Sequence, residues 1–536
     1  MNSIVTDDDV NGFAGDQPEA LLAALRAIHA KGRDPKDAST MLGPSAAPLV
    51  DAVPPAAGKR DIALEGDRPL VVDVDGTLIK SDLLLESLLA LLSTKPRAVL
   101  GAVAVLPRGR AAIKAYIARE AALRVETLPL NAELIAILRK ERAKGRKIYL
   151  ASGSDRRYVE ALSQHLRLFD GVFASDGKSN LSGKAKAMAL CEAFGEGGFD
   201  YAGNARPDRE VWERAHDVLM VNTTWGLRRR LRRRFPEAQE MGSRRLRLMD
   251  YVRACRVHQW LKNLLILIPA LAAHQIDPVS ALTLLVAFLS FSTFASGSYL
   301  INDLLDLGND RQHPVKRSRP FASGAIPLSH GPLFVAALLA TACALAHYLP
   351  STFTALLLGY GVLTLTYSLW LKRKMMVDVL MLACLYGMRL VAGGVAVAVP
   401  LSPWLVAFSI FLFLSLAIIK RCTELIACFE SGRGDPSGRG YQLRDLPVLE
   451  AMAAASGYVA VMVFAFYINS PAVMVLYHSP ERLWLICVIL IYWIGRMVVL
   501  THRGRMHTDP IVFAATDRVS LVSAAAVAAV VVAASV

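Results

Sequence analysis

The stretch Asn302-Asp303-Leu-Leu-Asp306-Leu-Gly-Asn-Asp310 follows a long apolar run and directly precedes a basic loop. Asp303, Asp306 and Asp310 are spaced i, i+3, i+7, so on a helix the three carboxylates lie on one face. Asn302 adds a neutral oxygen one turn before Asp306. Oxygen groups of this kind are the ligands that Mg²⁺ prefers. Carboxylates within a membrane are energetically costly, so their presence there indicates a function. The stretch therefore predicts a metal-binding site on a membrane helix rather than an ordinary polar helix end.

The basic loop that follows supports the same prediction. Four cationic side chains follow Asp310 within nine residues, as groups that bind an anion would: Arg311, Lys316, Arg317 and Arg319. Carboxylates that hold Mg²⁺ next to several cations are suited to a diphosphate.

The composition indicates a membrane protein. With 54% hydrophobic residues and a mean hydropathy of +0.37, the chain is too apolar for an ordinary soluble protein. The apolar residues are concentrated after about residue 263, which predicts an all-α membrane bundle of about nine transmembrane helices. The approximate ranges of these spans are 264–279, 280–301, 331–349, 351–371, 377–399, 403–420, 450–469, 482–500 and 518–536.

The loops between these spans alternate in charge. One set is rich in Lys and Arg, at 310–319, 372–374, 420–444 and 502–518, whereas the alternate loops carry almost none. By the positive-inside rule the basic set faces the cytoplasm. The net charge of +14 then reflects membrane topology and contact with anionic lipid, and not nucleic-acid binding.

Four regions follow from these patterns. We expect a mobile extension at residues 1–62, a soluble α/β domain at 63–226, a basic juxtamembrane linker at 227–262 and the membrane domain at 263–536. No signal-peptide pattern opens the chain, so the soluble domain is expected to stay in the cytoplasm, beside the plasma (inner) membrane of a bacterium. The seven cysteines show no metal-ligand spacing and are expected to be small apolar residues. The oligomeric state is left open.

A second set of polar residues lies at the cytoplasmic ends of the predicted spans. Basic groups at several helix ends that face one acidic cluster would suit a phosphorylated substrate. Arg389 lies near the middle of a span, where a charge is expensive and indicates a function. The predicted substrate-binding residues are His258, Gln259, Lys262, Asn263, Tyr367, Lys372, Asp378, Arg389, Lys420, Arg421 and Glu424, together with Lys316, Arg317 and Arg319 of the basic loop. Arg256, His507, Asp509, Asp517 and Arg518 lie at the same helix ends and belong to the same polar set.

These residues resemble a known family. The motif Asn302-Asp303-x-x-Asp306-x-x-x-Asp310 with nine apolar spans resembles the UbiA-type intramembrane prenyltransferases. Further segments resemble the branch that makes polyprenyl-phosphate phosphoribose, which includes the decaprenyl-phosphate phosphoribosyltransferases. They are 258–263, 310–320, Lys420-Arg421-x-x-Glu424, and Asp509-Pro510 with Asp517-Arg518.

The resemblance implies transfer of 5-phosphoribose from phosphoribosyl pyrophosphate to a polyprenyl phosphate, as a step in making cell-envelope precursors. Asn302, Asp303, Asp306 and Asp310 would bind Mg²⁺, and the three aspartates would be catalytic. The polyprenyl phosphate is already an anion, so no general base is needed. The two phosphate groups would be held by Lys262, Arg317, Lys372 and Arg421.

Two alternatives stay open at this point. One is prenyl transfer from a polyprenyl diphosphate to an aromatic acceptor such as 4-hydroxybenzoate, for which Asp435 and Asp445 could supply a second acidic motif. The other is a transporter or lipid scaffold without catalytic activity. Transporters tend to show paired repeats, and no convincing internal repeat is visible here.

The soluble region carries a separate set of motifs. Val71-Val72-Asp73-Val74-Asp75-Gly76-Thr77 is an apolar strand that ends in two aspartates, and it resembles the first motif of the haloacid dehalogenase superfamily, mostly phosphatases with a Rossmannoid fold. In that resemblance Asp73 is the nucleophile and Asp75 the general acid/base.

The later motifs of that superfamily follow in order. Ser152 would bond the phosphoryl group, and Lys186 would neutralise it, with Lys184 as the alternative. Asn204 and Asp208 would join Asp73 and Asp75 as ligands of Mg²⁺, although many relatives have Asp where this chain has Asn204. A helical insert at 82–125 resembles a cap that selects the substrate. The two domains together suggest that the soluble domain removes the 5-phosphate of the product that the membrane domain makes.

Overall fold

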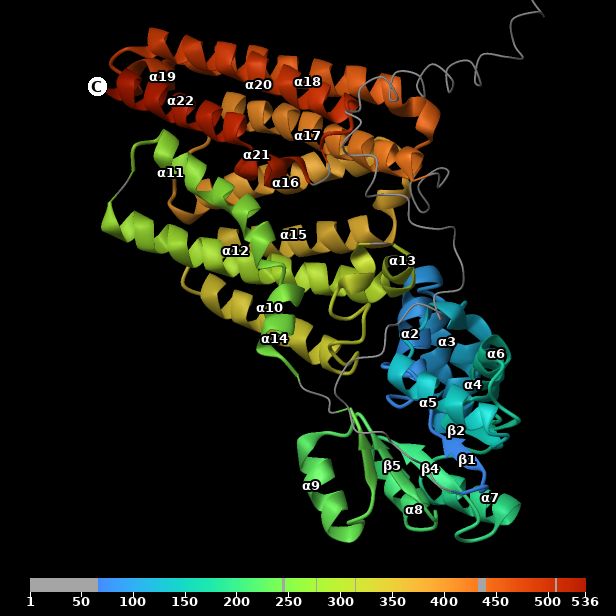
Figure 1. The fold of residues 1–536 in the computed structure, drawn as a ribbon. Helices are drawn as coiled ribbons and strands as arrows, with labels where there is room; N and C mark the ends of the chain where they lie inside the picture. Colours follow the sequence, from blue (N-terminus) through green and yellow to red (C-terminus); the bar gives the residue numbers. More distant parts are fainter. Residues whose placement is uncertain (1–65, 243–245, 276, 314, 432–439, 507–508) are drawn as a thin grey trace, which may run out of the picture. The chain divides into compact units, whose positions relative to one another are not determined.

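A computed structural model describes residues 66–242, 246–275, 277–313, 315–431, 440–506 and 509–536 (Figure 1). The predicted mobile extension at 1–62 lies outside the described residues. The chain divides into two compact units. The helical unit contains His258–Ser292 and Ala342–Val536, and the mixed unit contains the described part of Pro48–Val257 together with Thr293–Thr341. Helices α12 (Pro278–Leu305) and α14 (His330–Ala346) each contribute residues to both units.

The mixed unit contains a parallel sheet of six strands in the order β3-β2-β1-β4-β5-β6. In the central strand, Leu70 and Val72 belong to one apolar core and Val71 to another. This alternation buries both faces of the sheet, as parallel sheets require. The strands are β1 (Leu70–Val72), β2 (Ile148–Asp155), β3 (Gly171–Ser175), β4 (Asp200–Gly203), β5 (Val218–Val221) and β6 (Gln239–Met241).

Helices cover the two faces of this sheet. One core includes residues of α5 (Ala132–Ala143) and α6 (Arg156–Leu166). The other includes residues of α7 (Lys184–Phe194), α8 (Arg209–Trp212) and α9 (Trp225–Arg234). Because the strands are parallel, their carboxyl ends meet at one edge, where Asp73 and Asp75 directly follow β1.

The sheet continues beyond the end that the sequence predicts for the soluble domain. Strand β6 pairs with β5, and α9 packs on the sheet through Leu231. Residues 227–241, which were predicted to belong to the basic linker, are therefore part of the sheet layer. The Arg-rich surface of α9 is partly neutralised, because Arg232 forms two hydrogen bonds with Glu240 of β6.

The insert between β1 and β2 is helical. It contains α2 (Leu83–Thr94), α3 (Ala98–Val105) and α4 (Arg110–Glu120), which pack around Leu91, Ala102 and Ile117. Asp82 caps α2 by accepting a hydrogen bond from the backbone amide of Leu85 at 2.9 Å. A second apolar cluster joins Leu85 and Leu89 of α2 to residues from the end of α12 and from the 320–328 loop.

Seven helices in the described ranges are long and apolar enough to cross a membrane. These are α12, α15 (Ser351–Leu369), α16 (Val377–Ala396), α17 (Pro403–Glu430), the segment Leu443–Ile468 that contains α18 (Leu446–Ile468), the segment Pro480–His502 that contains α20 (Trp484–His502), and α22 (Arg518–Ser535). The first and third of the nine predicted spans coincide with shorter apolar segments, Val257–Ala272 and α14. A count of nine therefore stays a prediction.

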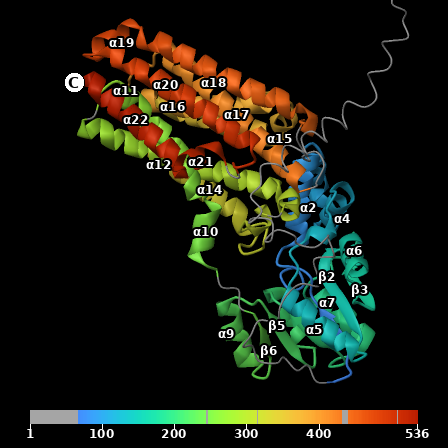
Figure 2. The ribbon, with the colours of Figure 1, turned by 45° about the horizontal axis from the view of Figure 1, so that its top comes forward.

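Within the helical unit, α17, α18 and α20 run side by side (Figures 1 and 2). Their contacts are close because small residues face the neighbouring helices. A side-chain carbon at Gly457 of α18 would lie 2.4 Å from a methyl carbon of Ile494 in α20. The connecting helices are short: α10 (Leu248–Ala254), α11 (Ile268–Ala272), α13 (Leu307–Gln312), α19 (Pro471–Leu476) and α21 (Pro510–Thr516).

Candidate functional sites

The aspartate motif lies where α12 ends and α13 begins, with Asp306 at the junction. The helical hydrogen bonds continue across it, from the amide of Asp306 to the carbonyl of Asn302 and from the amide of Asp310 to the carbonyl of Asp306, both 2.9 Å. Asp303 and Asp310 are buried, whereas Asn302 and Asp306 are half-buried.

Arginine connects the two buried carboxylates. The Nη1 atom of Arg319 donates to Asp303 at 3.0 Å and to Asp310 at 2.5 Å, and Arg256 donates to the same oxygen of Asp303. One cationic nitrogen between two carboxylates occupies a position that suits a divalent cation, and carboxylate oxygens are the ligands that Mg²⁺ prefers. The residues present thus fit Mg²⁺, with Arg256 and Arg319 as the groups that would turn to a bound phosphate.

The other basic residues of the 311–319 loop are placed differently. Lys316 is half-buried and Arg317 is exposed. Arg311 turns away from the aspartates and forms a bidentate ion pair with Glu86 of α2, at 2.9 and 2.5 Å. The spacing of Arg311 did not reveal this contact, because its partner lies 225 residues away.

We expect the Glu86–Arg311 pair to be important for stability. Both side chains are almost fully buried, and removing one member of such a pair leaves a buried charge, which costs about 3–5 kcal/mol. Glu86→Gln should therefore lower the thermal midpoint of the purified protein by several degrees, measured with a thiol-reactive dye. Glu196→Gln, at an exposed position, is the matched control. An unchanged midpoint in Glu86→Gln would contradict the assignment.

A second polar cluster lies in the helical unit and joins three distant segments. The side chain of Asp509 accepts hydrogen bonds from Lys262 at 2.7 Å and Lys420 at 3.0 Å. Although burial raises the pKa of Asp509, the charges of Lys420 and Lys262 outweigh it and hold this pKa well below the usual range. Asp509 therefore stays ionised and keeps both ammonium groups in one place.

The mid-span Arg389 is held within the bundle. Its Nε donates to Asn263 at 2.8 Å, its Nη2 to Tyr360 at 3.0 Å, and its guanidinium also lies over the ring of Tyr386 at 5.2 Å. Arg421 forms a similar network with Asp378 at 2.6 Å, Glu424 at 2.6 Å and Tyr367 at 3.0 Å. Both guanidinium groups thus bind protein groups in this structure, which indicates that they organise the helices around them.

Three other predicted substrate-binding residues differ in their exposure. His258 is exposed, and Gln259 and Lys372 are half-buried. Of the alternative acidic motif, Asp435 lies outside the described residues, and Asp445 accepts a hydrogen bond from the amide of Gln442 at the start of α18.

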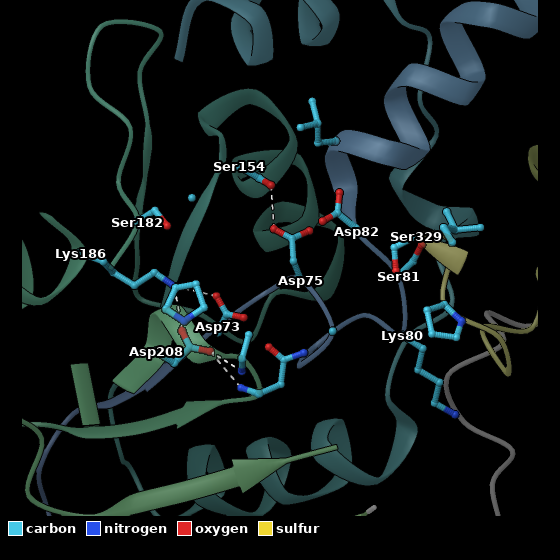
Figure 3. Close-up of a pocket in the computed structure, with 18 of the residues that line it drawn as sticks. Asp73, Asp75, Lys80, Ser81, Asp82, Ser154, Ser182, Lys186, Asp208 and Ser329 are labelled. Atoms are coloured by element: carbon cyan, nitrogen blue, oxygen red, sulfur yellow. Dashed lines mark hydrogen bonds and ion pairs between the residues drawn. The ribbon is translucent and has the colours of Figure 1, made fainter. Parts of the chain in front are cut away.

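In the mixed unit, a cavity of about 360 Å³ lies at the carboxyl edge of the sheet (Figure 3). Lys186 reaches from α7 and donates to Asp73 at 2.7 Å, to Tyr201 at 2.9 Å and to Asp208 at 3.4 Å. The alternative, Lys184, is exposed. Burial raises the pKa of Asp73 to about 7 against the opposing charge of Lys186, whose own pKa is raised by Asp73 and Asp208 despite its burial.

Asp75 is held at both carboxylate oxygens. One accepts from the amide of Leu83 at 2.7 Å, and the other accepts from the hydroxyl of Ser152 at 3.1 Å. The second oxygen also accepts from the hydroxyl of Ser154 at 2.7 Å (Figure 3). Burial, and then the charge of Asp82, raise the pKa of Asp75 to about 6. A carboxyl group with this pKa can carry a proton near neutral pH, as a general acid must.

The cavity also fits Mg²⁺. Asn204 lines it, and the side-chain oxygen of Asn204 is buried without a hydrogen-bond partner among the described residues. A buried amide oxygen of this kind is what a cation would complete, together with Asp73. Asp208 is engaged differently, because one of its oxygens accepts from the amides of Asn204 and Ala205 and the other from Tyr201 and Lys186. Its contacts indicate that Asp208 positions the loop that carries Asn204.

Gly76 is required by this arrangement. Its φ of +78° is unfavourable for other residues, and a side-chain carbon there would lie 1.9 Å from the amide nitrogen of Asn204. We expect Gly76→Ala to lower hydrolysis of p-nitrophenyl phosphate by at least roughly tenfold, since a displacement of about 1 Å in a site costs on the order of 10²-fold. Gly145→Ala, at an open turn with φ +87°, controls for backbone strain alone. Equal losses in both variants would contradict the steric argument.

The sequence did not reveal two further parts of this cavity. Lys114 of α4 lines it, although no motif marks that residue. Pro327, Leu328 and Ser329, from the loop after the aspartate motif, form another part of its wall (Figure 3). That loop fits closely, because a side-chain carbon at Gly324, where φ is +74°, would lie 2.7 Å from Cβ of Lys80.

Comparison with known proteins identifies the class. Seven apolar helices and a buried acidic cluster with arginine partners at the end of one of them indicate an integral membrane protein with a polar site. Residues 263–534 match the model of the UbiA prenyltransferase family, and the chain belongs to that family. It is thus a membrane enzyme, which sets aside the transporter or scaffold alternative.

The chain is also similar to individual proteins of known sequence or structure. The chain is 35% identical over 456 residues to the uncharacterized protein y4nM of Sinorhizobium fredii, a match that covers 84% of this chain and 88% of that one. It is 36% identical over 179 residues to the decaprenyl-phosphate phosphoribosyltransferase of Mycobacterium tuberculosis, covering 32% of this chain and 59% of that one. Among solved structures, a UbiA homolog from Archaeoglobus fulgidus bound to GPP and Mg²⁺ matches with 18% identity and a TM-score of 0.41, over 53% of this chain and 99% of that one.

Proposed function

We propose that the membrane domain transfers 5-phosphoribose from phosphoribosyl pyrophosphate to a polyprenyl phosphate, and that the soluble domain then removes the 5-phosphate. The observation that carries the first step is the pair of buried carboxylates, Asp303 and Asp310, bridged by Arg319. The similarity to decaprenyl-phosphate phosphoribosyltransferase supports the choice of donor and acceptor.

In the transfer step, an oxygen of the polyprenyl phosphate attacks C1 of the ribose and the bond from C1 to the diphosphate breaks. Mg²⁺, when bound, would neutralise the leaving diphosphate. Asp303, Asp306 and Asp310 would hold it, and Arg256 and Arg319 would bond the diphosphate oxygens as their charge increases. In the helical unit, Lys262 and Lys420 both donate to Asp509, and such a pair of ammonium groups suits a phosphate group.

In the hydrolytic step, the Asp73 carboxylate attacks the 5-phosphorus and the phosphorus–O5 bond breaks. Asp75 gives its proton to the leaving O5, and water then hydrolyses the aspartyl-phosphate with Asp75 as the base. Lys186, which touches Asp73, would balance the charge of the phosphoryl group. Mg²⁺ held by Asn204 and Asp73 would reduce the repulsion between the Asp73 carboxylate and the phosphate group.

The first step is tested with purified protein in detergent, Mg²⁺, polyprenyl phosphate and ribose-labelled phosphoribosyl pyrophosphate. Label is expected in the lipid phase. If no label enters the lipid, and the same protein prenylates 4-hydroxybenzoate from a polyprenyl diphosphate, the aromatic alternative replaces this proposal.

A further inference from the structure

The phosphatase cavity has two chemically distinct ends. Lys186 contacts Asp73, which would attack the phosphorus, so this end receives the phosphoryl group. Asp75, held by Ser152, Ser154 and the amide of Leu83, would protonate the leaving oxygen, so the alcohol part of the substrate lies at its end. A cation beside Asp75 therefore faces the alcohol part and not the phosphoryl group.

Lys114 is such a cation. Its ammonium donates to the carbonyl of Gly153 at 2.5 Å and to the side-chain oxygen of Asn180 at 2.8 Å. Gly153 lies between Ser152 and Ser154, the two residues whose hydroxyls bond Asp75. An ammonium has three donors, so one N–H remains for a ligand after these two contacts.

The surroundings of Lys114 leave its charge available to a ligand. Both acceptors are neutral, and no ion pair of Lys114 occurs among the described residues, whereas Lys186 is paired with two carboxylates. Burial lowers the pKa of Lys114, and Asp75 and Asp82 are the nearby acidic groups that oppose this. A half-buried ammonium with neutral partners attracts an anion more strongly than an exposed one.

We propose that Lys114 binds a second phosphate group, located in the alcohol part of the substrate, so that the cavity selects sugar phosphates with a phosphate at each end over simple monophosphates. The inference rests on the proposed phosphatase activity. A 5-phosphoribosyl unit joined through C1 to a lipid phosphate has this character, with a monoester to be cleaved and a phosphodiester to be recognised. Lys114 then acts as a specificity residue from the cap.

The test compares two soluble substrates on the full chain with Mg²⁺: ribose 5-phosphate, and ribose 5-phosphate with a methyl phosphodiester at C1. The wild-type protein should prefer the second by at least roughly tenfold in kcat/KM, as one charge-assisted contact allows. Lys114→Met should lose most of this preference through KM, with a much larger loss on the diester than on ribose 5-phosphate, and Lys114→Arg should retain the preference. Lys184→Met, at an exposed position of α7, is the matched control.

Two results would overturn the inference. One is equal kcat/KM of the wild-type protein for the two substrates. The other is an equal decrease in kcat/KM on both substrates in Lys114→Met, which would mean that Lys114 only holds Gly153 in place. If turnover is too slow to measure, dissociation constants of the same two compounds on Asp73→Asn, with and without Lys114→Met, give the same comparison. Neither compound requires the transferase. If the protein prefers the diester but does not dephosphorylate the lipid product, the proposed reaction order is rejected and the proposed role of Lys114 stands.

Discussion

Asp303→Asn is expected to lower phosphoribosyl transfer to polyprenyl phosphate by roughly 10³-fold, because a metal ion contributes several kcal/mol of charge stabilisation and each 1.36 kcal/mol is about tenfold in rate. Asp303 is buried between Arg256 and Arg319 and shares Arg319 with Asp310. Replacing one oxygen with an amide removes a ligand charge and leaves the arginines unbalanced. The readout is the initial rate of label transfer into the lipid phase at saturating Mg²⁺.

The matched control for this variant is Asp277→Asn. Asp277 precedes the opposite end of the same helix, α12, where it accepts hydrogen bonds from the amides of Val279 and Ser280 at 3.0 Å. Asn caps a helix about as well as Asp, so this change should leave transfer within about twofold. Equal rates for Asp303→Asn and Asp277→Asn would exclude the aspartate motif as the transfer site.

Asp73→Asn is expected to abolish the phosphatase step, with a loss greater than roughly 10⁴-fold, since the removal of a covalent nucleophile has effects of this size or larger. The transferase rate should not change, so the lipid product should accumulate with its 5-phosphate attached. Mass spectrometry of the extracted lipid measures both forms. Asp176→Asn is the control, because Asp176 is exposed and its oxygen accepts only local amide hydrogen bonds, from Lys178 and Ser179.

A 5-phosphate that disappears equally fast in Asp73→Asn and in the wild-type protein would assign its removal to another activity. Intact transfer in this variant is equally informative. It would show that the two steps use different sites and that the substitution has not unfolded the membrane domain.

The parts of the fold that could be predicted are those set by local sequence. The apolar run before Asp73 is buried on both faces, and seven of the predicted spans are long apolar helices. The end of the sheet was predicted too early, because the Arg-rich α9 buries only Leu231. Its strong positive charge therefore concealed a helix that packs on the sheet through Leu231 and the partly buried Leu227.

Contacts over long distances in the sequence could not be predicted. Spacing left Lys184 and Lys186 as alternatives, and only the burial of Lys186 beside Asp73 separates them. Arg311 and Arg319 have the same charge in the same loop, yet Arg319 faces the aspartates and Arg311 pairs with Glu86. Lys114 carries no motif, because its position depends on how the cap helices pack.

The measurement that tests the account most directly uses phosphoribosyl pyrophosphate with ¹⁴C in the ribose and ³²P at the 5-position. It is incubated with the wild-type protein, Mg²⁺ and polyprenyl phosphate. The account predicts that ¹⁴C enters the lipid and that ³²P enters it and is then released as inorganic phosphate, with release absent in Asp73→Asn. Failure of ¹⁴C to enter the lipid would contradict the transfer, and ³²P that stays in the lipid with ¹⁴C would contradict the phosphatase step.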